Sequence, residues 1–126
     1  MIKLTKGNLL EADVEALVNT VNCVGIMGKG IALQFKQAFR DNFQAYASAC
    51  REGKVKPGRI LAFPTNRMIN PKYIINFPTK RHWKEKSRLE YIEKGLNALV
   101  TEVRRLGIKN YCHTPFGMWL RWAEVA

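Results

Sequence analysis

The fold is decided by one stretch of the sequence, which reads Val18-Asn19-Thr20-Val21-Asn22-Cys23-Val24-Gly25-Ile26-Met27-Gly28-Lys29-Gly30-Ile31-Ala32. It continues an apolar, β-branched run from Val14 to Val21, which is typical of a strand buried on both faces. A loop with three glycines follows Asn22, and helical spacing begins at Ile31. Backbone amides in such a loop can approach an anion closely, and the helix N-terminus adds the positive end of its dipole. The stretch therefore predicts an anion-binding turn, with a tight turn that holds no ligand as the alternative.

The rest of the chain alternates between short strand patterns and longer helical ones. Apolar residues recur at three- and four-residue steps from Leu89 to Leu106, and Gly107 follows as a stop, so this segment predicts one long helix. Similar spacing from Ile31 to Cys50 predicts two helices or one broken helix. Strands interleaved with helices predict an α/β layer fold with helices on the faces of the sheet. The other expected strands cover residues 2–4, 58–64 and 73–77.

Length and composition predict one globular domain. The 126 residues, 47% of them hydrophobic and 25% charged, fit a single core. No apolar run approaches the ~18–20 residues that a membrane span needs, and no signal sequence is evident, so we expect a cytoplasmic protein that contacts no membrane. The three cysteines are widely spaced, which predicts neither a disulfide framework nor a zinc site, and no metal or other cofactor is expected.

The charge of the chain indicates a polyanionic partner. Its 21 lysines and arginines against 10 acidic residues give a net charge of +11, which favours nucleic acid, although a solvated basic surface is the alternative. Basic residues concentrate between Lys80 and Arg88 with aromatic rings among them, and such a segment can hold phosphates while a base stacks. The candidate nucleic-acid-binding residues are Arg81, His82, Trp83, Lys84 and Arg88.

Two motifs resemble the macrodomain family, in the DarG-type form of bacterial DNA ADP-ribosyl glycohydrolases. The first joins Ala16–Asn22 to Gly28–Phe35, and the second is Ile75–Trp83. The resemblance implies a three-layer α/β/α sandwich with a mixed central sheet and an ADP-ribose cleft above the strand ends. It also implies a monomer that removes ADP-ribose from bases in DNA, with ADP-ribosylated DNA as substrate and a DNA ADP-ribosyltransferase toxin as counterpart.

The resemblance implies roles for individual residues. Asn22 would hold the distal ribose, and Lys80 would act at the anomeric carbon of that ribose. A neutral lysine could attack or accept a proton and a charged one could polarise the leaving base, whereas a simple phosphate-facing cation is the alternative. Near the position of Asn8, macrodomains usually carry an aspartate that accepts a hydrogen bond from the adenine amino group. The side-chain carbonyl of Asn8 can still accept this bond, and Asp13 is a nearby acidic alternative. The expected ADP-ribose-binding residues are Asn8, Asp13, Asn22, Gly25, Met27, Gly28, Lys29, Gly30, Ile31 and Gly117.

The sequence departs from the family pattern after about Asn110. Macrodomains carry a second glycine loop here, typically Ile-Ala-x-Pro-Pro-Leu-Gly-x-Gly, whereas only Gly117 of that pattern remains. Codons that can encode Tyr111–Leu120, read one base later, give Ile-Ala-Thr-Pro-Pro-Leu-Gly-Cys-Gly. We interpret the segment as the product of a frameshift, and we expect one macrodomain over residues 1–126 that is altered or incomplete after about residue 110, without the last strand and helix.

Three functions therefore compete. The first is the DNA ADP-ribosyl glycohydrolase that the resemblance and Lys80 favour. The second is a module that binds ADP-ribose without cutting it. The third is a plain nucleic-acid-binding domain, which would bind nucleic acid with a steep salt dependence and ignore free ADP-ribose.

Overall fold

The computed structural model describes residues 2–5, 10, 12–113 and 119–122, and these form one six-stranded mixed sheet in the order β1-β6-β5-β2-β4-β3. Strand β2 (Ala16–Val21) lies inside the sheet and pairs in parallel with β4 (Tyr73–Pro78) and β5 (Tyr111–His113). The remaining pairs are antiparallel and involve β1 (Ile2–Thr5), β3 (Leu61–Pro64) and β6 (Trp119–Trp122). The predicted mixed sheet is confirmed.

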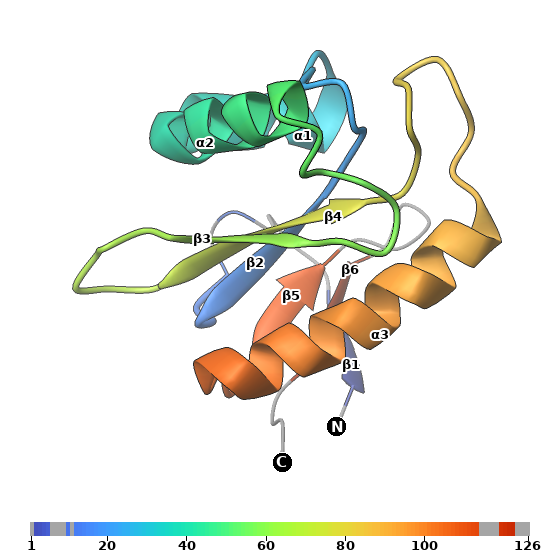
Figure 1. Cartoon of the computed structure of the whole chain (residues 1–126). Helices are drawn as coiled ribbons and strands as arrows, with labels where there is room; N and C mark the ends of the chain where they lie inside the picture. Colours follow the sequence, from blue (N-terminus) through green and yellow to red (C-terminus); the bar gives the residue numbers. More distant parts are fainter. Residues whose placement is uncertain (1, 6–9, 11, 114–118, 123–126) are drawn as a thin grey trace.

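Helices cover both faces of this sheet and give three layers (Figure 1). Helices α1 (Gly30–Ala38) and α2 (Arg40–Arg51) lie on one face, and α3 (Leu89–Leu106) lies on the other. The sequence predicted α3 with the same bounds, and Gly107 ends it with a φ of 69°, in the left-handed region that favours glycine. The ambiguous helical pattern is two helices that separate at Phe39. Among the described residues, no helix is long and apolar enough to cross a membrane.

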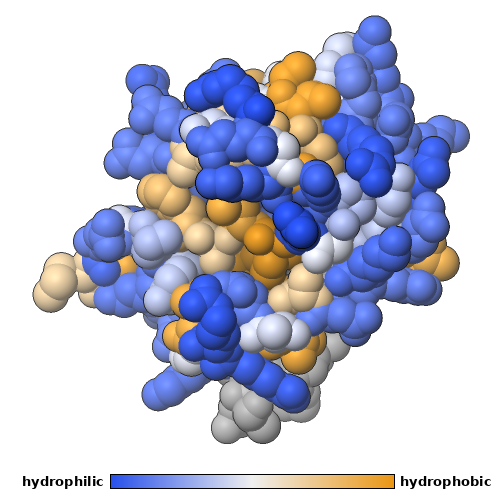
Figure 2. Space-filling view, viewed as in Figure 1, coloured by the Kyte–Doolittle hydropathy of each residue, from blue (hydrophilic) through white to orange (hydrophobic). Residues whose placement is uncertain are grey.

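The strands β2 and β4 supply both hydrophobic cores, because successive side chains of a strand point to opposite faces of the sheet. One core lies under α1 and α2, and the other lies under α3. Figure 2 shows hydrophilic residues over most of the face in view. The first core contains Leu17, Val21, Ile74, Phe35 and Tyr46, and the second contains Val18, Ile75, Phe77, Leu99 and Val103.

Two of the expected strands begin later than the pattern predicted. The strand expected from Val14 begins at Ala16, because the Val14 amide donates to the Ala12 carbonyl over 3.0 Å in a turn. The strand expected from Gly58 begins at Leu61, because Gly58 has a φ of 84° and cannot continue extended backbone.

A pair of buried asparagines joins α2 to β4. Asn42 donates from Nδ2 to Asn76 Oδ1 over 3.2 Å, and Asn76 donates back to Asn42 Oδ1 over 2.8 Å. Both side chains are fully buried, and Asn76 also donates to the Leu61 carbonyl. Such a pair satisfies its own polar groups in a core where unpaired ones would be costly, so it fixes the position of α2 over the sheet.

Gly95 lets α3 approach β4 closely. A Cβ atom at Gly95 would lie 2.4 Å from Cζ of the buried Phe77 ring. We therefore expect Gly95→Ala to lower the free energy of unfolding by about 1–3 kcal/mol through overpacking. The loss should appear even though alanine is favoured over glycine inside a helix by about 1 kcal/mol.

Chemical denaturation of Gly95→Ala and of Asn97→Ala checks this expectation. Asn97 is exposed on the same helix, so its alanine variant should be as stable as the parent or slightly more stable. Close packing at Gly95 is refuted if both variants gain stability.

Candidate functional site

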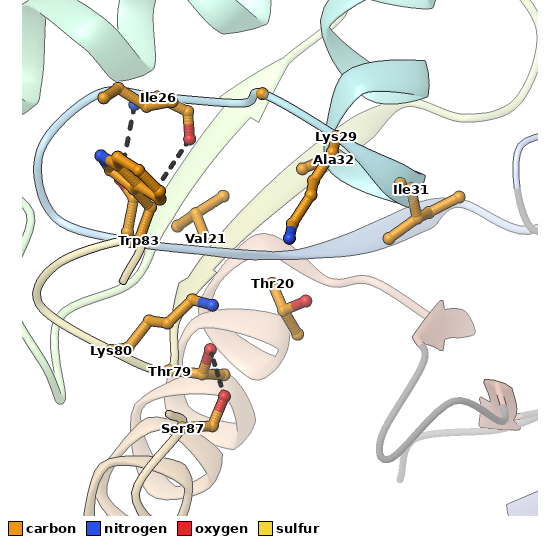
Figure 3. Close-up of a pocket in the computed structure, with 13 residues that line it drawn as sticks. Thr20, Val21, Ile26, Lys29, Ile31, Ala32, Thr79, Lys80, Trp83 and Ser87 are labelled. Carbon is orange, nitrogen blue, oxygen red and sulfur yellow. Dashed lines mark hydrogen bonds between the residues drawn. The ribbon is translucent and has the colours of Figure 1, made fainter. Parts of the chain in front are cut away.

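A pocket opens where the carboxyl ends of β2 and β4 meet the N-terminus of α1 (Figure 3). Its volume is about 670 Å³, within the range of small-molecule sites. Three segments form its walls: the end of β2 and Asn22, the glycine loop into α1, and the segment that follows β4. The lining residues are Thr20, Val21, Asn22, Ile26, Gly28, Lys29, Gly30, Ile31, Ala32, Thr79, Lys80, Trp83 and Ser87.

Asn22 is a buried residue that lines this pocket, and its side chain shapes the loop. Its Oδ1 accepts from the Tyr46 hydroxyl over 2.7 Å and from the Val24 amide over 3.1 Å. Its Nδ2 donates to the Ile26 carbonyl over 2.9 Å. An amide has two N–H donors, and the contacts of the described residues use one of them. Asn22 can therefore offer a ligand one N–H, while its oxygen is committed to the protein.

Backbone hydrogen bonds hold the segment after β4 beside the glycine loop. The Thr79 amide donates to the Val21 carbonyl over 3.0 Å, and the Cys23 amide donates to the Arg81 carbonyl over 2.9 Å. These bonds extend the β2·β4 ladder past its last residue pair, Val21 and Pro78. Lys80 lies between the two bonds, so its position at the pocket wall is set by the sheet.

Two lysines extend into the pocket from opposite walls. Figure 3 shows Lys29 reaching down from the start of α1 and Lys80 reaching in from the segment after β4. No aspartate or glutamate is among the described lining residues, and α1 has no acidic residue in its first turn. Two cations and the positive end of a helix dipole make the pocket attractive to an anion such as a diphosphate.

The thiol and hydroxyl groups next to this pocket are protonated. Burial, followed by the neighbouring Cys50, raises the pKa of Cys23 to about 11, so the thiol stays protonated at neutral pH and is a poor nucleophile. Burial likewise raises the pKa of the Tyr46 hydroxyl, which stays protonated as a hydrogen-bond donor. In the described part of the chain, no three His, Cys, Asp or Glu side chains gather as metal ligands would.

The structure brings five of the ten predicted ADP-ribose-binding residues together at the pocket. Met27 is 1% exposed and faces the core, where its Sδ lies 3.7 Å from Asn19 Nδ2, because an apolar side chain gains more from burial there. Gly25 makes the turn with a φ of 88° and packs towards Ala47 of α2. The residues that do line the pocket are Asn22, Gly28, Lys29, Gly30 and Ile31.

Asp13 does not reach the pocket. It precedes β2, whereas the pocket lies at the far end of that strand, and its carboxylate accepts a hydrogen bond from Asn70 Nδ2 over 2.8 Å. Asn8 and Gly117 lie outside the described residues.

The predicted nucleic-acid-binding residues divide into two groups. Trp83 lines the pocket and is 44% exposed. The His82 ring stacks on the Trp83 ring with 5.5 Å between the ring centroids, and Lys84 Nζ lies 5.2 Å from the Trp83 ring centroid. Arg81 and Arg88 lie instead against Tyr91 of α3.

Sequence reasoning missed several lining residues. Thr79 and Ser87 place hydroxyls beside Lys80 in Figure 3, with the two oxygens 3.3 Å apart. Their proximity to Lys80 in the sequence was the available signal, but hydroxyl residues in a basic segment form no recognisable motif. The residues not predicted are Thr20, Val21, Thr79 and Ser87.

The Macro domain family model matches residues 18–118, and the chain belongs to the macrodomain family. The chain is 52% identical to a protein of Thermus aquaticus named DNA ADP-ribosyl glycohydrolase, over 99% of this chain and 36% of that protein. It therefore spans about a third of the length of the curated relatives that it matches first.

Solved structures agree with this placement. The macrodomain of Thermus aquaticus DarG superposes with a TM-score of 0.86 at 55% identity, covering 89% of this chain and 74% of that one. The Thermosipho africanus DarTG structure in complex with ADP-ribose superposes with a TM-score of 0.77 at 30% identity, covering 85% of this chain and 31% of that one.

Removal of the Tyr46 hydroxyl tests its role in holding Asn22. We expect Tyr46→Phe to lower the free energy of unfolding by about 1–3 kcal/mol, because buried Asn22 oxygens lose a donor. The affinity of the pocket for a diphosphate ligand should fall as well, since the loop would lose one of its anchors.

Denaturation and titration calorimetry measure the two effects, with Tyr73→Phe as the matched control. Tyr73 packs against the second core, on the other face of the sheet from Tyr46, so removal of its hydroxyl should change little. Equal losses in the two variants would contradict the assigned role of Tyr46.

Proposed function

We propose that this chain is a glycohydrolase that removes ADP-ribose from bases in DNA, and that it acts in the cytoplasm as a monomeric antitoxin to a DNA ADP-ribosyltransferase toxin. The observation that carries the proposal is the position of Lys80 inside a pocket whose other walls are Asn22 and the glycine loop. The activity named for the Thermus aquaticus relative supports it. Its ligands would be ADP-ribose and ADP-ribosylated DNA, without a cofactor.

The pocket could hold two polar parts of ADP-ribose, the diphosphate and the distal ribose. The amides of Gly28, Lys29 and Gly30 at the start of α1 can donate to the diphosphate, helped by the Lys29 ammonium. The remaining N–H of Asn22 can donate to a hydroxyl of the distal ribose. In this proposal the ribose would lie between Asn22 and Lys80, with its anomeric carbon on the lysine side.

Lys80 would supply the chemistry. Hydrolysis breaks the bond between the anomeric carbon and the base nitrogen; water gives its hydroxyl to the sugar and a proton to the base. A charged Lys80 can protonate or polarise the departing base, and a neutral Lys80 can attack the carbon before water releases it. Both roles need the amine within reach of the reacting bond, as its place in the pocket allows.

Two other functions predict different results. A module that binds ADP-ribose without cutting it would release nothing from ADP-ribosylated DNA, with or without Lys80. A plain nucleic-acid-binding domain would not bind free ADP-ribose. Lys80 in the pocket is the observation that favours the enzyme over both, because neither alternative needs a lysine beside the ribose.

We expect Lys80→Ala to abolish release of ADP-ribose from DNA while its affinity for ADP-ribose stays within about tenfold, or ~1.4 kcal/mol. An interaction made mainly in the transition state lowers the barrier without tightening the ground state, so its loss reduces turnover and not binding. Single-turnover release from an ADP-ribosylated oligonucleotide and titration calorimetry measure the two quantities.

Lys109→Ala is the matched control. Lys109 is exposed and precedes β5, which runs parallel to β2, so it lies at the opposite edge of the sheet from the pocket. Its variant should behave as the parent does. Full turnover by Lys80→Ala would show that Lys80 is only a surface cation and would overturn the catalytic assignment.

We also propose that one macrodomain occupies residues 1–126 and that a frameshift near Asn110 replaced its second glycine loop. Sequencing of the coding DNA checks this, since a reading frame that cannot yield Gly-x-Gly would exclude it. A chain carrying Ile-Ala-Thr-Pro-Pro-Leu-Gly-Cys-Gly at this place should bind ADP-ribose more tightly, because more backbone amides would reach the diphosphate.

A further inference from the structure

Two arginines of the basic segment share one aromatic ring outside the pocket. Arg81 Nε donates to the Tyr91 hydroxyl over 3.2 Å, and its guanidinium carbon lies 5.7 Å from the centroid of the Tyr91 ring. The Arg88 guanidinium carbon lies 5.6 Å from the same centroid. Tyr91 is itself 7% exposed, so it is a fixed support that brings two exposed cations together.

The N-terminus of α3 adds positive potential at the same place. Arg88 is the N-cap of this 18-residue helix, and within the described chain no side chain caps it. Helix N-termini normally favour Ser, Thr, Asp or Asn at this position, and a cation there opposes the helix dipole. A local rule broken without an internal compensation is expected at a binding site.

Two carboxylates lie near this cluster, and both are exposed to solvent. Glu90 lies 3.7 Å from Arg88, but both side chains are more than half exposed, and such solvated pairs contribute little. Glu85 is the acidic residue that acts on Arg81. Each arginine keeps guanidinium N–H groups that can donate to a phosphate, which a guanidinium binds with two parallel hydrogen bonds.

The cluster adjoins the pocket through the backbone. The Arg88 amide donates to the Thr79 carbonyl over 3.2 Å, and Ser87 immediately before it lines the pocket. A strand that delivers one base to Lys80 would therefore pass its backbone along Ser87 towards the two arginines.

We propose that Arg81, Arg88 and the N-terminus of α3 form a phosphate site on Tyr91 that holds the backbone of single-stranded DNA beside the pocket. The site is separate from the residues that would hold ADP-ribose, and it would recognise the strand next to the modified base. The choice of DNA as the polyanion rests on the proposed function.

Binding of a labelled, unmodified single-stranded oligothymidine to the full chain tests this site, with fluorescence anisotropy at several salt concentrations. We expect the double variant Arg81→Gln, Arg88→Gln to bind about tenfold more weakly at low salt. Its plot of log affinity against log salt should be shallower by about 0.7 for each phosphate that the protein no longer neutralises. The double variant Arg81→Lys, Arg88→Lys should keep the salt dependence but not the full affinity, because lysine lacks the planar fork.

Arg104→Gln is the matched control. Arg104 is an exposed arginine in the last turn of the same helix, 16 residues after Arg88 and about 24 Å along the axis at 1.5 Å per residue. It should bind as the parent does. Equal weakening in Arg104→Gln would show a general charge effect and overturn the site. Full affinity of the double lysine variant for the oligothymidine would also overturn it.

Release of ADP-ribose from modified DNA, measured in parallel, separates the two proposals. If the parent releases ADP-ribose but the glutamine variant binds the oligothymidine normally, the phosphate site is wrong and the glycohydrolase stands. If binding depends on the arginines but nothing is released, the phosphate site stands and the proposed activity fails.

Discussion

The pocket depends on the buried contact between Tyr46 and Asn22. The Tyr46 hydroxyl lies 2.7 Å from Asn22 Oδ1 and 2.8 Å from the Asn22 carbonyl oxygen, and its side chain is fully buried in the first core. A tyrosine held by α2 therefore fixes the residue at which β2 ends and the loop begins. Because α2 is itself tied to β4 through Asn42 and Asn76, the loop geometry is set by the packing of a whole layer.

The second wall follows from the sheet. Parallel pairing of β2 and β4 brings their carboxyl ends to one edge of the sheet. A ligand can bind at such an edge where the connections that leave two neighbouring strands run in opposite directions. The pairing continues through Thr79 and Arg81, so Lys80 is placed by strand register. A rigid element under a reactive group positions it more accurately than a free loop could.

The electrostatics divide the basic surface into two tasks. Lys29 and Lys80 face the pocket, which suits a small anion, whereas Arg81 and Arg88 gather on Tyr91 outside it. A surface that binds DNA needs cations spaced along a strand, and a pocket for ADP-ribose needs donors converging on one point. In the proposed function the segment after β4 would supply both, because its successive residues turn to different sides.

The resemblance to macrodomains made Lys80 the candidate catalyst. The sequence by itself determined the strand, glycine loop and helix around Asn22, the helix Leu89–Leu106 and the layered α/β class. These are local signals, since periodicity and glycine placement report which face of an element is buried and where it ends. The tertiary structure decided which distant residues meet. Only packing could show that Tyr46 occupies the oxygen of Asn22, that Met27 faces the core, and that Asp13 lies at the wrong end of β2. The physical reason is that a residue pattern encodes the orientation of a side chain relative to its own element, whereas a site is made by side chains from elements that the chain brings together only on folding.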